Sequence, residues 1–338
     1  MEMLKESMQF KTLLGEIKSQ ISSSQQKALL AVNRELVILY WSIGNNILEA
    51  QAREGWGTKI IDQLAKEIKF DFPQLKGFST RNLKYMRQFA EAYPEFEFVQ
   101  VTLAQIPWYH NITLLDKVKN VDERTWYVLK VIENGWSRNT LVHQIEGGLY
   151  TRQVTVEKTS NFMQKLPVPQ NRLAVETLKD PYIFDFITMR AEMNERDIEA
   201  ELVKKVTKLL LEMGSGFAFI GNQYHLNVGG DDYYLDLLFY NLKLRCYVVV
   251  EMKTGKFKPE YAGKVNFYLS AVDDLLKTEQ DQPTIGIILC KEKNKVVAEY
   301  ALKDISKPIG VSEYKLCEYM PEELKGTLPS IEELEDRL

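Results

Sequence analysis

Two charged residues close an otherwise apolar segment near residue 250, and few folds can accommodate this arrangement. Residues 247–250 read Tyr-Val-Val-Val and are followed directly by Glu251, Met252 and Lys253. Because the side chains of a strand alternate between its faces, Glu251 and Lys253 are expected to point the same way. Burying both charges is costly unless they are paired or hold an ion. The segment therefore predicts an interior strand with a polar site at its end.

A third charged residue interrupts the preceding apolar segment. Asp236 lies within residues 233–240, where every other side chain is leucine, phenylalanine or tyrosine. The link 241–245 is short, so the two strands are expected to form an antiparallel hairpin that brings Asp236 beside Glu251. Two carboxylates provide hard oxygen ligands, which Mg²⁺ and Mn²⁺ prefer. The sequence therefore predicts a metal site at Asp236 and Glu251.

Lys253 would complete a set of residues suited to phosphodiester hydrolysis. A bound metal would polarise the scissile phosphate and lower the pKa of an attacking water. Lys253 could orient that water and offset the charge of the phosphate. The alternative is an ordinary salt bridge between Glu251 and Lys253 at a strand end, because the pattern is short.

The sequence around these residues predicts a mixed α/β domain. A stretch rich in alanine and glutamate is followed by apolar, strand-like segments. The order helix, three strands, helix, strand indicates a mixed sheet with helices on its faces. The expected elements are a helix at 193–213, strands at 217–228 (bulged near Gly221), 233–240 and 246–253, a helix at 259–276, a strand at 284–290, a short helix at 296–302 and a strand at 309–316.

The first half of the chain has the apolar spacing of helices. Residues 10–47 and 56–70 show helical periodicity, and Ser79 can cap a further helix that ends before Pro94. A glycine, an aromatic residue and a serine occur before this helix and again at residues 135–137. The repetition indicates either two similar helix-turn-helix units or two ordinary helix starts that use the same cap.

Basic side chains on these two helices are candidates for contact with DNA. Arg81, Lys84 and Arg87 lie on the first helix and Arg138 begins the second. A recognition helix presents such side chains to the major groove or to phosphates. The alternative is that they form the solvated face of a scaffold or a dimer interface.

Length and charge restrict the organisation of the chain. A chain of 338 residues suggests two domains, and its net charge of −4 means that DNA contact must come from local basic patches. Prolines at 167, 169 and 181 interrupt the helical pattern. We therefore expect a helical domain at 1–165, a linker at 166–190 and a second domain at 191–338.

The chain is expected to be cytoplasmic and to have no membrane partner. The N-terminus lacks the apolar core of a signal peptide, and the longest apolar runs are far shorter than the roughly 20 residues of a membrane span. Cys246, Cys290 and Cys317 are widely spaced in apolar stretches, so we interpret them as buried thiols rather than disulfide or zinc ligands.

Short motifs along nearly the whole chain can be compared with known families. In the second half they are GFAFIGNQY at 216–224, DLLFY at 236–240, VVEMK at 249–253, FKPEYAG at 257–263, IGIILC at 285–290 and PIGVSEY at 308–314. In the first half they are YWSIG at 40–44, GFSTRN at 77–82, IPWYH at 106–110 and NGWSRN at 134–139. Together they resemble the YhcG-type proteins, a family assigned to the PD-(D/E)XK nuclease superfamily.

This resemblance implies a restriction-endonuclease-like αβββαβ fold with Asp236, Glu251 and Lys253 in the catalytic positions. Leu235 stands where the superfamily's name has a proline. Superfamily members often add an acidic residue from the helix before the first strand. Glu199 is the first candidate for this role and Glu201, on the same helix, is the second.

Two further polar residues fit the same site. Gln223, in the first strand, could contact metal-bound water or phosphate, and Lys264, near the start of the following helix, could contact phosphate. The alternatives are an ordinary hydrogen bond for Gln223 and a solvated surface position for Lys264.

The leading hypothesis is a DNA endonuclease that depends on Mg²⁺ or Mn²⁺. Its helical domain would position DNA or a protein partner, and a homodimer is compatible with this hypothesis. One alternative is a nuclease-fold module that binds nucleic acid without cutting it. The other is a helical adaptor whose partner supplies the function.

Overall fold

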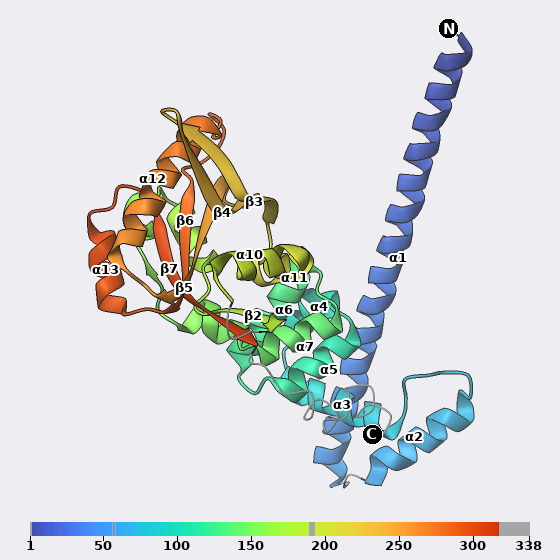
Figure 1. Ribbon diagram of the computed structural model, residues 1–338. Coiled ribbons are helices and arrows are strands. Elements are labelled where there is room, and N and C mark those ends of the chain that lie inside the picture. The colour runs from blue at the N-terminus through green and yellow to red at the C-terminus, as the bar shows by residue number, and fades with distance from the viewer. Residues whose placement is uncertain (1, 56, 58, 189–192, 318–338) are drawn as a thin grey trace. The chain divides into compact units, whose positions relative to one another are not determined.

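The computed structural model describes residues 2–55, 57, 59–188 and 193–317, which form two compact units (Figure 1). The first unit spans Met1–Gly147 and the second Gly148–Leu338. None of the helices in the described part of the chain combines the length and apolar content that crossing a membrane requires. Cys246 and Cys290 are buried free thiols, as expected, whereas the side chain of Cys317 lies outside the described part.

The first unit is helical in all its described elements, as the apolar spacing predicts. Its longest element, α1, packs its C-terminal half against α3, where an added Cβ on Gly44 would lie 1.9 Å from the carbonyl oxygen of Met86. This close approach excludes any larger side chain at position 44. The elements are α1 (Glu2–Glu54), α2 (Lys59–Asp71), α3 (Thr80–Ala92), α4 (Phe96–Val101), the 3₁₀-helix η1 (Leu103–Gln105), α5 (Trp108–Lys117), α6 (Val121–Asn134) and α7 (Arg138–Glu146).

Both predicted serine caps are present. The Ser79 hydroxyl accepts a hydrogen bond from the Asn82 amide at the start of α3, and Ser137 accepts one from Thr140 at the start of α7. Gly135 ends α6 in the left-handed conformation, with φ of 61°. The cap chemistry that the sequence predicts is therefore present at both helix starts.

The second unit is a mixed sheet covered by helices on both faces, as predicted. Strands β3, β4 and β5 are antiparallel, whereas β5, β6 and β7 are parallel (Figure 1). The order across the sheet is β1-β7-β6-β5-β4-β3, and β2 pairs with β7. The elements are η2 (Thr151–Thr155), β1 (Thr159–Ser160), α8 (Phe162–Lys165), α9 (Gln170–Thr177), β2 (Tyr182–Thr188), α10 (Glu195–Lys204), α11 (Val206–Met213), β3 (Phe217–Val228), β4 (Asp231–Asn241), β5 (Cys246–Lys256), α12 (Pro259–Leu275), β6 (Ile285–Glu292), α13 (Lys295–Lys303) and β7 (Ile309–Cys317).

The predicted alternation of side chains along β5 is confirmed by its two cores. Val248, Val250 and Met252 pack in a cluster with residues of α10 and α11. Val249 packs on the other face with residues of α12 and α13. Because Glu251 follows this alternation, it shares the face of Val249. The bulge expected in β3 is also present, as a register shift between Phe219 and Gly221.

The expected linker at 166–190 is wrong. Residues 170–177 form α9 and residues 182–188 form β2, which pairs in parallel with β7. Leu178, Tyr182 and Phe184 are fully buried in the core of the second unit. The prolines that suggested a linker lie at the boundaries of short elements within this unit instead, and the chain divides between Gly147 and Gly148 rather than near residue 165.

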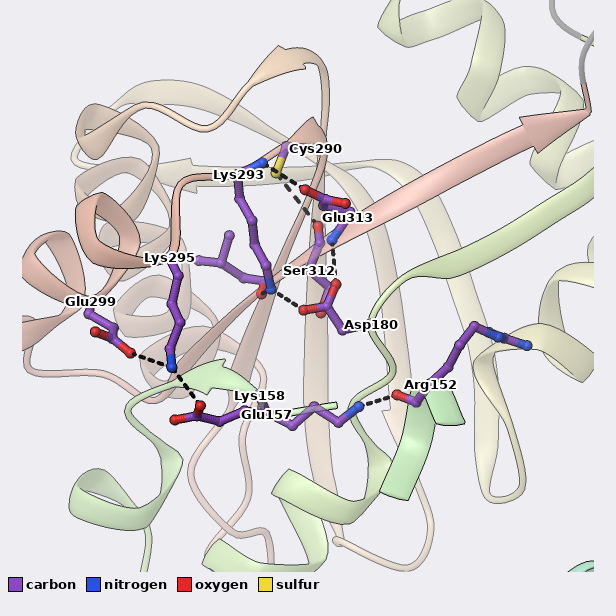
Figure 2. A network of polar contacts seen from close by, with 11 residues as sticks. Arg152, Glu157, Lys158, Asp180, Cys290, Lys293, Lys295, Glu299, Ser312 and Glu313 are labelled. Carbon is purple, nitrogen blue, oxygen red and sulfur yellow. Dashed lines mark hydrogen bonds and ion pairs between the residues drawn. The ribbon is translucent and has the colours of Figure 1, made fainter. Parts of the chain in front are cut away.

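A network of buried ion pairs and hydrogen bonds connects residues 152–180, at the start of this unit, to the sheet (Figure 2). The Asp180 carboxylate is ion-paired with the Lys293 ammonium and accepts the backbone N–H of Glu313 at 3.0 Å. Lys293 also donates to the Val311 carbonyl at 3.0 Å. Lys158 donates to the carbonyl of Arg152, and burial lowers the pKa of this lysine to about 8. These contacts join residues 152–180 to β6 and β7.

Replacing Asp180 by alanine is expected to destabilise the protein by about 3 to 5 kcal/mol, because Lys293 would be left as an unpaired buried cation. The matched control is Glu157→Ala, which breaks the exposed pair between Glu157 and Lys295 and should cost less than about 1 kcal/mol. Denaturant unfolding of the full chain measures both values. Equal losses in the two variants would show that the buried network does not anchor this segment.

Candidate active site at the end of the β4–β5 hairpin

The site lies where the ladder between β4 and β5 stops. Backbone pairing runs from Asn241 opposite Cys246 to Leu237 opposite Val250, and Asp236 and Glu251 come next on the two strands. Asp236 is 8% exposed, and its Oδ2 accepts the backbone N–H of Met252 at 2.8 Å. The Asp236 carboxylate thus accepts the hydrogen bond that a backbone carbonyl would accept if the ladder continued. The hairpin holds Asp236 and Glu251 side by side, as the sequence predicts.

Glu251 is completely buried, and the cations that contact it among the described residues all contact one of its oxygens. Its Oε1 lies 2.5 Å from the Lys264 Nζ and 3.0 Å from the Lys253 Nζ. Its Oε2 is buried and has no hydrogen-bond partner among the described residues. An anionic oxygen without a partner in such a position is costly unless a cation or donor binds there.

Lys253 is held by three acceptors. Its Nζ donates to Glu195 Oε2 and to the carbonyl of Met252, both at 2.8 Å, and contacts Glu251. The Tyr261 ring centroid lies 5.4 Å from the ammonium. Burial alone would lower the pKa of Lys253, but the hydrogen bond to Glu195 and the charge of Glu251 outweigh burial and raise it. Lys253 therefore stays cationic over the physiological pH range.

Helix α10 contributes two carboxylates to the site. Glu195 and Glu199 are one turn apart, which places them on the same helix face. Glu199 is 2% exposed and accepts a hydrogen bond from Gln223 Nε2 at 2.6 Å. Gln223 has a positive φ of 45°, so its backbone departs from regular strand geometry beside Asp236's strand. A strained non-glycine residue of this kind is characteristic of functional sites.

Burial and mutual repulsion raise the pKa of two of these carboxylates, Asp236 and Glu199. Burial, followed by the charge of Glu251, raises the pKa of Asp236 to about 7. Burial and the nearby charges of Glu251 and Glu195 also raise the pKa of Glu199, although its hydrogen bond with Gln223 opposes this. The site therefore has more negative charge than its two lysines neutralise.

These features fit a divalent cation. Asp236 and Glu251 supply hard oxygen ligands, and the unpartnered Oε2 of Glu251 is available to bind. In the described part of the chain, no three or more histidine, cysteine, aspartate or glutamate side chains form a ready-made metal cage. Mg²⁺ commonly uses one or two carboxylates and takes its remaining ligands from water and phosphate oxygens.

The structure brings together most residues predicted for this site. Gln223 and Glu199 join Asp236, Glu251 and Lys253, whereas Glu201, the second candidate on α10, pairs with Lys204 at 2.8 Å.

Lys264 and Glu195 differ from what the sequence suggests. Lys264, a candidate either for phosphate contact or for a solvated surface position, is ion-paired with Glu251, and the ring of Tyr268 lies 5.2 Å away. Glu195 was not among the predicted residues, although it binds both the Lys253 ammonium and, at 3.3 Å, the Thr254 amide. In the sequence it is one of several acids in the first turn of a helix.

The basic residues predicted on the helical unit have different surroundings. Arg81 and Lys84 are exposed on α3, where Arg81 stacks over Tyr85. Arg87 is engaged by Gln51 at 2.7 Å and Glu91 at 3.2 Å. Arg138 is exposed but its Nε donates to the Thr113 hydroxyl at 3.1 Å. Arg87 therefore has a packing role as well as a charge.

Comparison with known proteins gives matches to both halves of the chain. A family model described as the YhcG PDDEXK nuclease domain matches residues 175–329, and one described as the DUF1016 N-terminal domain matches residues 16–152. Residues 175–329 thus match a PD-(D/E)XK nuclease domain, and nearly the whole chain is similar to proteins of the YhcG-type family. The Escherichia coli (strain K12) protein described as "Putative nuclease YhcG" is 29% identical over 330 residues, covering 88% of this chain and 87% of that protein.

Solved structures give more distant matches. They include a complex of EndoMS with double-stranded DNA, at a TM-score of 0.27 and 14% identity, covering 38% of this chain and 47% of that one. A repair endonuclease from Pyrococcus abyssi matches with a TM-score of 0.26 and 14% identity, covering 38% and 49%. The chain spans about half the length of these two proteins.

Proposed function

We propose that this chain is a divalent-metal-dependent DNA endonuclease, with Asp236, Glu251 and Lys253 as its catalytic residues. The observation that carries the proposal is the unpartnered Oε2 of buried Glu251 beside Asp236, whose pKa is raised to about 7. A protein core without a ligand to bind would gain stability by replacing such carboxylates. Their presence on a PDDEXK nuclease domain supports a metal-binding role.

Each residue has a distinct task in this proposal. Asp236 and Glu251 would hold Mg²⁺ or Mn²⁺, which supplies Lewis acidity toward the phosphate and favours ionisation of water. Lys253, fixed by Glu195 and the Met252 carbonyl, would direct its ammonium at the attacked phosphate. Glu199 and Gln223 would orient water at the same site through their shared hydrogen bond.

The helical unit would position the substrate or a protein partner. Arg81 and Lys84 are exposed on one helix and are suited to phosphate contact. Lys264 would turn from Glu251 to phosphate when a metal neutralises that carboxylate. This exchange keeps the predicted phosphate role of Lys264 compatible with its present ion pair.

The test is a cleavage assay of the purified full chain on plasmid, linear, single-stranded and branched DNA with Mg²⁺ or Mn²⁺. We expect metal-dependent cleavage that EDTA abolishes and that the Asp236→Ala variant lacks. The control variant is Asp231→Ala, an exposed position at the start of the same strand, which should cut at the wild-type rate. Cleavage that survives in Asp236→Ala would refute the assignment of the site.

A module that binds nucleic acid without cutting is the second candidate. The two lysines at Glu251 Oε1 favour it, because internal ion pairs can neutralise a carboxylate without any metal. Calorimetric titration with Mn²⁺ separates the two functions. A nuclease site takes up Mn²⁺ in a manner that depends on Asp236, whereas a site neutralised only by lysines does not bind it.

A further inference from the structure

The first part of α1 carries an exposed apolar stripe. In Figure 1 this part of the helix, in dark blue, stands clear of the other helices of its unit. Its apolar side chains are separated mostly by three or four residues, which places them along one face. They are between 36% and 71% exposed, and they are Phe10, Leu13, Leu14, Ile17, Ile21, Leu29, Val32, Leu36 and Leu39.

Such a stripe is the pattern of a helix that pairs with another helix. Spacings of three and four residues that alternate are those of coiled-coil core positions. Helices are marginally stable in water without tertiary contacts, so this segment needs a partner along its length. The described residues of the first unit pack only against the C-terminal half of α1, around Val37, Tyr40 and Gly44.

Ile43 continues the apolar face beyond Leu39, and with it the spacing of the apolar residues is the same from both ends. Phe10, Leu14, Ile17 and Ile21 are spaced by four, three and four residues, and so are Ile43, Leu39, Leu36 and Val32 read backwards. Two copies of the helix running in opposite directions would therefore place each of these eight residues against another of the eight. This is the self-complementary arrangement that a twofold axis requires.

The segment between these two groups is mostly polar, because residues 22–28 read Ser-Ser-Ser-Gln-Gln-Lys-Ala. Ile21 and Val32 are eleven residues apart, which is three turns of a nearly straight helix, so the two apolar groups lie on the same helix face. In an antiparallel pair each apolar group would contact the other group of the second copy, and the polar segment would lie at the twofold axis between them.

A cavity beside the C-terminal end of the stripe could accept the N-terminal end of the partner's helix. Between α1 and α2 lies an apolar cavity of about 230 Å³, lined by Ile43, Ile47, Ile60 and Leu64 among others. An antiparallel partner brings Phe10 to the level of Ile43, at this cavity.

The area also suits a stable pair. Burying about 100 Å² from each of the nine side chains would remove roughly 900 Å² per copy, close to the roughly 800 Å² per partner of a typical stable interface. We propose that two copies of this chain form an antiparallel helix pair through the α1 stripe, with Phe10 of each copy reaching the cavity between α1 and α2 of the other.

The first experiment measures the mass of the full chain by light scattering at micromolar concentration. We expect a dimer for the wild type and half that mass for Ile17→Asp/Ile21→Asp. The matched control is Ser19→Asp/Ser23→Asp, which adds the same charge to the opposite helix face and should remain dimeric. Circular dichroism checks that each variant folds. A monomeric wild type would overturn the proposal, whether the stripe is then covered by another segment of the same chain or exposed to solvent.

Cysteine cross-linking then determines the direction of the pair. Leu14 and Leu39 are mirror positions in the stripe, so a Leu14→Cys copy should form a disulfide with a Leu39→Cys copy only when the two proteins are mixed. A disulfide formed by Leu14→Cys alone would show parallel helices and contradict the antiparallel arrangement. Neither measurement depends on nuclease activity, so this inference stands or falls independently of the proposed function.

Discussion

Exchanging Asp236 for asparagine is expected to abolish cleavage and to stabilise the metal-free protein at the same time. Asparagine retains an oxygen that can accept the Met252 amide but cannot carry the charge that a divalent metal requires. Loss of the metal's contribution should lower the cleavage rate by about 10³-fold or more, since a metal supplies several kcal/mol of transition-state stabilisation.

The stabilisation follows from the raised pKa of Asp236. In the unfolded chain this carboxyl titrates near its ordinary value of 3.8, and in the folded protein near 7. Between these values the folded state binds more protons, so the wild type loses stability as pH rises through this window. Asparagine does not titrate. The variant should therefore gain about 1 to 3 kcal/mol over wild type above pH 7, and the gain should vanish below pH 4.

Thermal unfolding in EDTA at several pH values measures this gain, and Asp231→Asn is the control on the same strand. Adding Mg²⁺ should reverse the order, because metal binding stabilises only the wild type. A variant that is less stable than wild type at pH 8 without metal would mean that Asp236 serves the fold rather than a bound cation.

The local sequence was sufficient to predict the hairpin that carries the candidate site. Asp236 and Glu251 are recognisable because each interrupts an apolar strand, where an uncompensated charge would be expensive. Strand alternation gave the common direction of Glu251 and Lys253, and the short link gave the antiparallel pairing. These inferences depend on neighbours within one hairpin, so they need no knowledge of the rest of the chain.

The features that could not be predicted depend on contacts between distant segments. Strand β2 pairs with β7, so the chain around residues 182–188 looks like a linker unless its remote partner is known. Glu195 meets Lys253 only because α10 packs beside the end of β5. Lys264 meets Glu251 only because α12 covers that face of the sheet. Sequence patterns specify which side chains are buried, but not which of them meet across the core.

Replacing Lys253 by methionine should separate catalysis from metal binding. Methionine keeps much of the side-chain volume but has no charge, and Lys253 is the best-fixed cation of the site. We expect cleavage to fall by about 10² to 10⁴-fold, the range typical of lost proton-transfer or charge-stabilising groups. Mn²⁺ affinity should be kept or increased, because the substitution removes a positive charge next to the two carboxylates proposed to bind the metal. Calorimetry and single-turnover cleavage measure the two quantities.

Lys264→Met is the informative comparison, because both lysines contact the same oxygen of Glu251. The Lys264 side chain is 43% exposed and that of Lys253 only 10%, so Lys264 can leave the carboxylate at little cost. Its removal should raise Mn²⁺ affinity and weaken DNA binding, seen as a higher KM, while the cleavage rate at saturating DNA changes less than about tenfold. Equal losses of cleavage rate in both variants would contradict this division of roles. They would mean that each lysine acts through the charge of Glu251, and that Lys253 has no separate part in the chemistry.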